Sequence, residues 1–139
     1  MTSNKRLLGF DFGLKRIGVA SGQLITKTAT PIGTINCPDK TPNWHEISKL
    51  IEKWRPTDII VGLPIDAHGE ETEITKLSRL FSDELSKRYQ KPIHLVEEAY
   101  STREARWKLE EVKGKKINHL KVDALAACVI LETWMREYR

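Results

Sequence analysis

The hydrophobic pattern of this 139-residue chain changes its period near residue 41. Before that point, residues 6–12, 16–21 and about 28–36 form short runs rich in apolar and β-branched residues, which indicate strands. The turn Gly13-Leu-Lys15 joins the first two runs as a hairpin, and the third follows closely, so we predict an antiparallel meander. Beyond it, helices and strands alternate, which favours a mixed sheet containing parallel strands.

Apolar residues at helical spacing define the second part of the chain. Asn43 and Glu46 have the spacing of a capping box, and Arg55-Pro56 closes the helix that they begin. The other predicted elements are a buried strand at 58–62, a helix through Ile74 and Leu85, a strand at 92–97, a helix capped by Ser101 and Glu104, and a last helix at about 121–137. This order predicts one α/β domain over residues 1–139, with a mixed five-stranded sheet and helices on both faces.

Composition limits the class of protein more than its function. Lysines and arginines exceed acidic residues by 23 to 19, a net charge of +4, which is compatible with a polyanionic partner or with an ordinary basic surface. No apolar run approaches the roughly 20 residues of a membrane span, and the N-terminus lacks a secretory signal. The cysteines, Cys37 and Cys128, lack metal-type spacing, and we interpret them as reduced thiols, which are typical of a cytoplasmic protein. We therefore expect a cytoplasmic protein, and the lack of a membrane span predicts no membrane partner.

Acidic residues occur at three places that this architecture would bring together. Asp11 lies in the first strand between two phenylalanines, where a carboxylate costs several kcal/mol unless it is paired or bound to metal. Glu97 and Glu98 end the fifth strand, and Asp123 lies in the first turn of the last helix. Taken singly, Glu97 and Glu98 could face solvent, and Asp123 could favour the positive end of the helix dipole.

Taken together, these carboxylates predict a metal site. A cluster rich in carboxylates and poor in histidine suits Mg²⁺ or Mn²⁺ better than zinc. Two such ions roughly 3.5–4 Å apart can activate a water and stabilise the leaving oxygen of a phosphodiester. The four histidines show no ligand spacing, and we interpret His45, His68 and His94 as surface residues.

Several other residues are candidates for binding a nucleic-acid backbone. Gly13 and Gly18 allow a tight hairpin and a close approach of phosphate, and the loop from Gly62 to Gly69 presents backbone amides. The substrate-binding candidates on these segments and beside Asp123 are Gly13, Lys15, Arg16, Gly62, His119 and Lys121. The alternative is an ordinary solvated turn, a plain connecting loop and surface side chains.

Four blocks of the sequence resemble the YqgF/RuvX family, in family order and over nearly the whole chain. The blocks are Asp11-Phe-Gly-Leu-Lys-Arg-Ile-Gly-Val-Ala20, Ile60-Val-Gly-Leu-Pro64 with Gly69, Glu97-Glu98…Ser101-Thr102…Ala105, and Val122-Asp123…Ala126-Ala127…Ile130-Leu131. The resemblance implies a ribonuclease H-like fold related to the RuvC resolvase. It also implies a cytoplasmic bacterial nuclease that helps mature the 5′ end of pre-16S ribosomal RNA.

Carried over by position, Asp11, Glu98 and Asp123 match the acidic residues of the family and are the expected catalytic groups and ligands of Mg²⁺ or Mn²⁺, with Glu97 as a further candidate ligand. One departure stands out: the family usually has Asp-Glu-Arg where this chain has Glu97-Glu98-Ala99. The arginine that would touch phosphate is therefore absent, and Arg103 on the next helix could replace it.

Two other functions compete with RNA maturation. Older descriptions of the family name a Holliday junction resolvase, which cuts branched DNA as a symmetric dimer. Trp134 could anchor a dimer, but we favour core packing for it and expect a monomer or a weak homodimer. The second is a non-catalytic RNA-binding or protein-binding module, supported by the missing arginine and opposed by the acidic side chains at all three places. An actin-like ATPase would need two such lobes, and 139 residues are too few.

Overall fold

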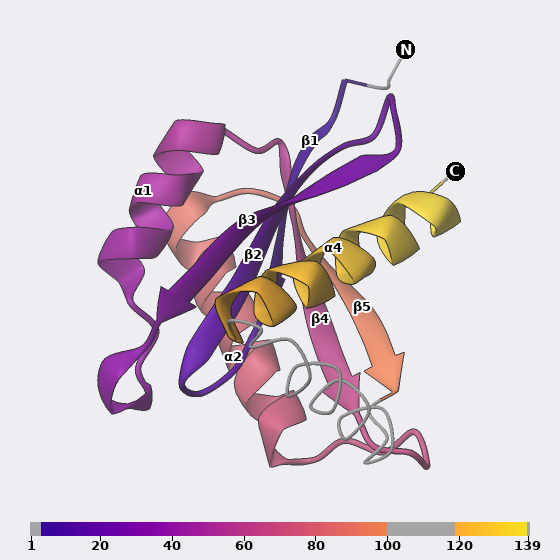
Figure 1. Ribbon diagram of the computed structural model, residues 1–139. Helices are drawn as coiled ribbons and strands as arrows, with labels where there is room; N and C mark the ends of the chain where they lie inside the picture. The colour runs from indigo at the N-terminus through magenta and orange to yellow at the C-terminus, as the bar shows by residue number, and fades with distance from the viewer. Residues whose placement is uncertain (1–3, 100–118, 139) are drawn as a thin grey trace.

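A computed structural model describes residues 4–99 and 119–138, which form a five-stranded sheet with helices on both faces (Figure 1). Its strands are β1 (Arg6–Asp11), β2 (Arg16–Gln23), β3 (Thr28–Asn36), β4 (Asp58–Ile65) and β5 (Ile93–Ala99). Its helices are α1 (Trp44–Trp54), α2 (Glu73–Tyr89) and α4 (His119–Glu137), with a 3₁₀ turn at Pro38–Lys40. The predicted order of elements is confirmed for these residues, and the helix predicted from Ser101 and Glu104 lies outside them.

The strands lie in the order β3-β2-β1-β4-β5. The pairs β1–β2 and β2–β3 are antiparallel, as the predicted meander requires, whereas β1–β4 and β4–β5 are parallel. Strand β4 continues to Ile65, beyond the predicted end at residue 62. Pro64 is tolerated within it because the last pair between β1 and β4 is Phe10 with Val61, so Pro64 has no β1 residue opposite it. The carboxyl ends of β1, β4 and β5 therefore share one edge of the sheet, which is where α/β proteins usually bind ligands.

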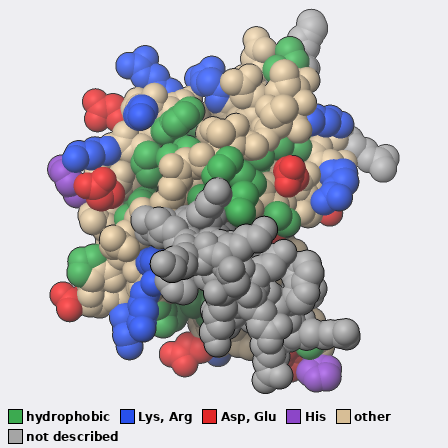
Figure 2. Space-filling view, viewed as in Figure 1, with side chains coloured by type: hydrophobic (Ala, Val, Ile, Leu, Met, Phe, Trp, Pro, Cys, Tyr) green, Lys and Arg blue, Asp and Glu red, His purple; other side chains and the backbone are tan. Residues whose placement is uncertain are grey.

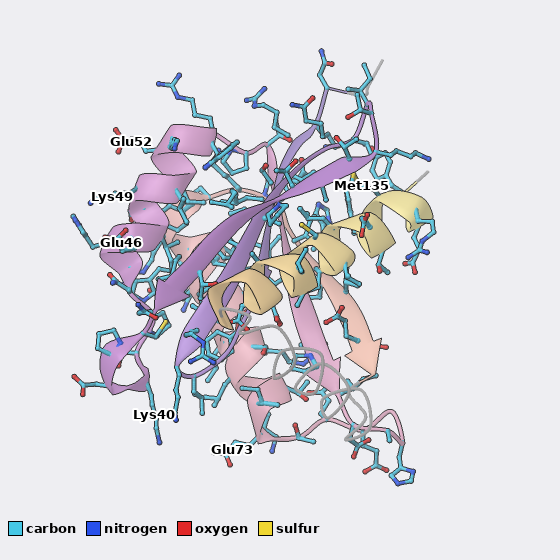
Figure 3. The ribbon with its side chains drawn as sticks, viewed as in Figure 1. Lys40, Glu46, Lys49, Glu52, Glu73 and Met135 are labelled. Atoms are coloured by element: carbon cyan, nitrogen blue, oxygen red, sulfur yellow. The ribbon has the colours of Figure 1, made fainter. Side chains whose placement is uncertain are left out.

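Alternate residues of each strand enter two separate cores. Leu8 and Phe10 of β1 belong to the core under α1 and α2, with Ile47, Ile51, Phe81 and Leu85. Leu7 of β1 belongs to the core under α4, with Ile60, Val96, Ile130, Leu131 and Met135. Figure 3 shows Met135 between α4 and the sheet, and Glu46, Lys49 and Glu52 along the outer side of α1. This alternation assigns each strand residue to one face of the sheet.

Helix boundaries differ slightly from those predicted. The side chain of Asn43 accepts a hydrogen bond of 3.3 Å from the Glu46 amide, as in half of the predicted capping box. Helix α4 begins at His119 rather than at residue 121, so Asp123 lies in its second turn and not in the first. The helix-dipole explanation for Asp123 is correspondingly weaker, since the dipole effect falls off within the first turn.

A group of charged side chains closes the opposite, amino-terminal edge of the parallel strands. Asp58 at the start of β4 accepts hydrogen bonds from Lys5 at 3.1 Å and pairs with His94 of β5 at 2.8 Å. His94, predicted as a surface residue, is partly exposed at 34%, but it is also a partner in this charged group. The His94 ring lies 4.8 Å from the ring of Trp134 on α4, so Trp134 packs within the domain as we favoured.

Two further expectations concern the whole chain. Cys37 and Cys128 are both buried and free, as the prediction of reduced thiols requires. Among the residues that the structure describes, none of the helices has the length and apolar character to cross a membrane.

Candidate active site

Asp11 is the last residue of β1 and lies on the face of the sheet that α4 covers. Its partner across the antiparallel pair is Gly18 of β2. Two residues earlier on β1, Gly9 lies so close to α4 that an added Cβ would be 2.6 Å from Leu131. Because strand residues alternate between faces, Asp11 lies on the same side as Gly9, at the carboxyl edge.

Asp123 approaches this position because Gly18 has no side chain. A Cβ on Gly18 would collide with the backbone carbonyl of Asp123, which packs directly on the strand. The structure thus gives Gly18 a different role from the predicted one: it admits α4 rather than the phosphate backbone. Since Gly18 pairs with Asp11, this contact brings the backbone of Asp123 next to the first acidic residue.

Glu98 lies on the same face, on β5. Val96, two residues earlier, is buried in the core under α4, so the pleat directs Glu98 toward that helix as well. A Cβ on Gly62 of β4 would lie 3.6 Å from a carboxylate oxygen of Glu98 and 3.0 Å from Cγ1 of Ile130. Gly62 is therefore buried beneath Glu98 and α4, and the structure does not bring it to the pocket as a substrate contact.

Glu97 lies on the opposite face of the sheet, toward α2. The negative charge of Glu97 acts on Arg79 of α2, which forms an ion pair of 2.6 Å with Glu71. The register of β5 therefore favours Glu98 over Glu97 as the partner of Asp11.

A pocket of 380 Å³ opens at the carboxyl edge between β1, β4 and α4. Two of the acidic residues line it, together with the β1–β2 hairpin and the start of α2: Asp11, Phe12, Gly13, Leu14, Lys15, Arg16, Pro64, Ile74 and Asp123. Gly13 closes the hairpin, since an added Cβ would lie 2.6 Å from the Arg16 carbonyl oxygen. The predicted substrate residues Gly13, Lys15 and Arg16 are thus gathered at the same pocket as Asp11 and Asp123.

Arg16 already contacts one of these carboxylates. Its Nε donates a hydrogen bond of 3.0 Å to Oδ2 of Asp123. The two side chains are 35% and 26% exposed, so the pair is partly open to solvent. Lys15, next to it, is exposed at the hairpin tip.

The donor chemistry of this face fits a hard divalent cation, because Asp11, Glu98 and Asp123 offer carboxylate oxygens from three elements. The arrangement does not gather them: within residues 4–99 and 119–138, no group of three or more His, Cys, Asp or Glu side chains is close enough to hold one metal ion. Strand β4 separates β1 from β5, which places their backbones about 10 Å apart. Ligation by all three would therefore require their side chains to move toward one another.

The remaining predicted substrate contacts are Arg103, His119 and Lys121. Arg103 lies outside the described residues. The backbones of His119 and Lys121 form the first turn of α4, one turn before Asp123.

Comparison with known proteins agrees with the fold and the order of these elements. The model of the family RuvX, described as Holliday junction resolvase, matches residues 5–137. Proteins from Francisella tularensis subsp. novicida strain U112 and subsp. tularensis strain SCHU S4, whose name describes a candidate pre-16S rRNA nuclease, are 63% and 62% identical over 131 residues. These matches cover 94% of this chain and 96% of each relative.

Two solved structures share the fold at low sequence identity. Thermus thermophilus RuvC in complex with a Holliday junction substrate has a TM-score of 0.51 at 12% identity, covering 95% of this chain and 94% of RuvC. The fowlpox virus Holliday junction resolvase has a TM-score of 0.53 at 16% identity, covering 96% of this chain and 99% of the resolvase. The predicted ribonuclease H-like architecture is confirmed, and the chain belongs to the RuvX family of nucleases.

Proposed function

We propose that this chain is a metal-dependent nuclease that hydrolyses phosphodiester bonds in the maturation of the 5′ end of pre-16S ribosomal RNA. The observation that carries the proposal is the placement of Asp11, Glu98 and Asp123 on one face of the sheet, at the edge where a pocket with cationic side chains opens. The names of the relatives from Francisella support the RNA substrate. Processing of such a precursor places the activity in the bacterial cytoplasm.

The residues of the pocket have separable roles in this proposal. Lys15 and Arg16 bind the phosphates that flank the bond to be cut, because guanidinium and ammonium groups pair with phosphate oxygens. Asp11, Glu98 and Asp123 would hold Mg²⁺ or Mn²⁺. Two such ions, when bound, would supply an activated water and stabilise the charge on the leaving oxygen. The hairpin of β1 and β2 positions the phosphate against these carboxylates.

Cleavage of two substrates tests the function. Purified protein is incubated with pre-16S leader RNA and with a four-way DNA junction, each with Mg²⁺, with Mn²⁺ or with EDTA. We expect metal-dependent cleavage of the RNA, and a loss on the order of 100-fold in Asp11→Asn, since metal ions supply several kcal/mol of transition-state stabilisation. No metal-dependent cleavage, or equal cleavage by Asp11→Asn, would contradict the proposal.

The neighbouring glutamates provide a matched pair of variants for this assay. Glu98→Gln removes a carboxylate from the face of Asp11, whereas Glu97→Gln makes the same chemical change on the opposite face. We expect Glu98→Gln to lose cleavage as strongly as Asp11→Asn and Glu97→Gln to keep it within about threefold, which is under 1 kcal/mol. The reverse ranking would place the ligand at Glu97.

Cleavage of branched DNA is the second candidate, favoured by the description of the family model. Paired cuts in a junction need two active sites and hence a symmetric dimer. Figure 2 shows hydrophobic side chains in the middle of the face that α4 covers, with basic and acidic side chains around them. Leu125 and Val129 of α4 are 48% and 50% exposed. Cleavage of the junction but not the RNA, by a protein with the molar mass of a dimer, would support this candidate. Metal-independent binding of RNA without cleavage would indicate a non-catalytic module.

A further inference from the structure

The ion pair between Arg16 and Asp123 joins two residues to which the proposed function gives different partners. Arg16 is expected on a phosphate and Asp123 on a cation. In the structure their side chains contact each other at 3.0 Å, and both line the pocket that contains Asp11. One contact therefore occupies a phosphate-binding group and a metal-binding group at once.

The ion pair between Arg16 and Asp123 can readily be replaced by contacts with other partners. Both side chains are partly exposed, and exposed ion pairs of this type contribute little to folding. Guanidinium binds carboxylate and phosphate oxygens with the same fork of donors, so a phosphate can replace the carboxylate of Asp123 without loss of geometry. Arg16 can therefore change partners at low cost.

The positive charge of Arg16 also opposes a cation at the same carboxylate. A guanidinium 3.0 Å from Oδ2 neutralises the charge that would attract a divalent ion and repels that ion directly.

We propose that Arg16 is an exchangeable counter-ion that couples metal binding to nucleic-acid binding. It holds Asp123 in the free protein, moves to a backbone phosphate when nucleic acid binds, and so releases Asp123 to the metal. The inference rests on the proposed function, because it takes Asp123 as a ligand of the metal. Coupling of this kind is reciprocal, so bound metal also frees Arg16 for phosphate.

Metal binding without nucleic acid gives the first test. Mn²⁺ affinity is measured by electron paramagnetic resonance for the wild type, Arg16→Met, Arg16→Lys and Asp123→Asn. We expect Arg16→Met to bind Mn²⁺ about fivefold more tightly, the scale of an exposed ion pair, Arg16→Lys to remain near the wild type, and Asp123→Asn to bind more weakly. Arg88→Met is the control, since it removes an arginine from an exposed pair with Glu84, in the half of α2 remote from Ile74.

Nucleic-acid binding without metal gives the second test. Fluorescence anisotropy with labelled leader RNA in EDTA reports affinity while cleavage cannot proceed. Asp123→Asn frees Arg16 and should tighten RNA binding by about fivefold, and this gain should vanish in the double variant with Arg16→Met. Glu84→Gln, which removes one negative charge beside Arg88, measures the effect of charge alone.

The outcomes separate this inference from the proposed function. Absence of Mn²⁺ binding from every variant contradicts the metal site itself and the proposed function with it. Weaker or unchanged Mn²⁺ binding in Arg16→Met, with the wild type binding normally, contradicts only the exchange. Weaker binding would further show that Arg16 positions Asp123 as a ligand. Tighter RNA binding that persists in the double variant of Asp123→Asn and Arg16→Met would also contradict the exchange.

Discussion

Two aspartates at opposite edges of the same sheet pair with cationic side chains, but their surroundings differ. Asp58 opens β4 at the amino-terminal edge, its side chain is 3% exposed, and it contacts both Lys5 and His94. Asp123 lies on α4 at the carboxyl edge, its side chain is 26% exposed, and it pairs with Arg16 beside an open pocket. The first pairing joins structural elements, whereas the second stands where a ligand can enter.

The difference teaches how burial separates a structural charge from a functional one. Burial alone would raise the pKa of Asp58, but hydrogen bonds from His94, Lys5 and Thr57 outweigh it and hold the pKa below its usual value. A carboxylate fixed in this way is costly to disturb, because its loss leaves Lys5 and His94 without their partner. The side chain of Asp123 is partly exposed, so water can solvate its carboxylate when Arg16 leaves, and its partner can change.

The largest expected effect is on cleavage at the carboxyl edge. Asp123→Asn should reduce metal-dependent cleavage of leader RNA on the order of 100-fold, because a neutral amide binds a divalent cation far more weakly. The free energy of unfolding should change by less than about 1 kcal/mol, as is usual for an exposed ion pair. Cleavage rates and urea unfolding of the same preparation check both statements, and a large loss of stability would give Asp123 the structural role of Asp58.

Asp58→Asn should show the opposite behaviour. Removal of a buried, charged acceptor should lower the free energy of unfolding by about 2 kcal/mol. Cleavage per folded molecule should stay within about threefold, under 1 kcal/mol, because Asp58 lies at the other edge of the sheet. The test is urea unfolding together with cleavage at a temperature where the variant remains folded. A loss of cleavage without a loss of stability would contradict the division between the two edges.

The fold was predictable because its signals are local and repeated. The change of period near residue 41, the helix stop at Arg55-Pro56 and the apolar run after Asp58 each depend on neighbouring residues. The greater length of β4 was not predicted because a proline normally interrupts a strand. Only the pairing of the strands shows that β1 no longer lies beside β4 at the level of Pro64.

The site was only partly predictable because it depends on contacts between distant residues. Three acidic positions could be identified, but the choice between Glu97 and Glu98 required the face of β5. The preceding residues, Ile93-His-Leu-Val96, place apolar side chains on both faces of that strand and so give no clear alternation. The network of Asp58 was missed for the same reason, as its partners are 53 and 36 positions away. A usable signal did exist, since Asp58 and His94 each stand near the start of neighbouring parallel strands.

Glycines beneath α4 offer a finer comparison. Gly18→Ala places a methyl group against the backbone of Asp123, which cannot yield as a side chain can, whereas Gly9→Ala meets only the side chain of Leu131. Both should destabilise the protein by about 1–3 kcal/mol through overpacking. We expect only Gly18→Ala to lower cleavage further, by about tenfold per folded molecule, because it displaces a residue of the site. Equal cleavage by the two variants would show that the fit of α4 on Gly18 does not position Asp123.

Acidification should produce the smallest effect, and we follow it at Asp58 on the amino-terminal edge. The pKa of Asp58 is lowered in the folded protein, so its contribution to stability is present above the unfolded pKa of about 3.9 and is lost as the pH falls through the folded value. The difference in unfolding free energy between the wild type and Asp58→Asn should therefore be constant near neutral pH and narrow below about pH 4. Urea unfolding from pH 7 to pH 3 measures this difference. Its persistence at the lowest pH would mean that Asp58 stabilises the sheet by its shape rather than by its charge.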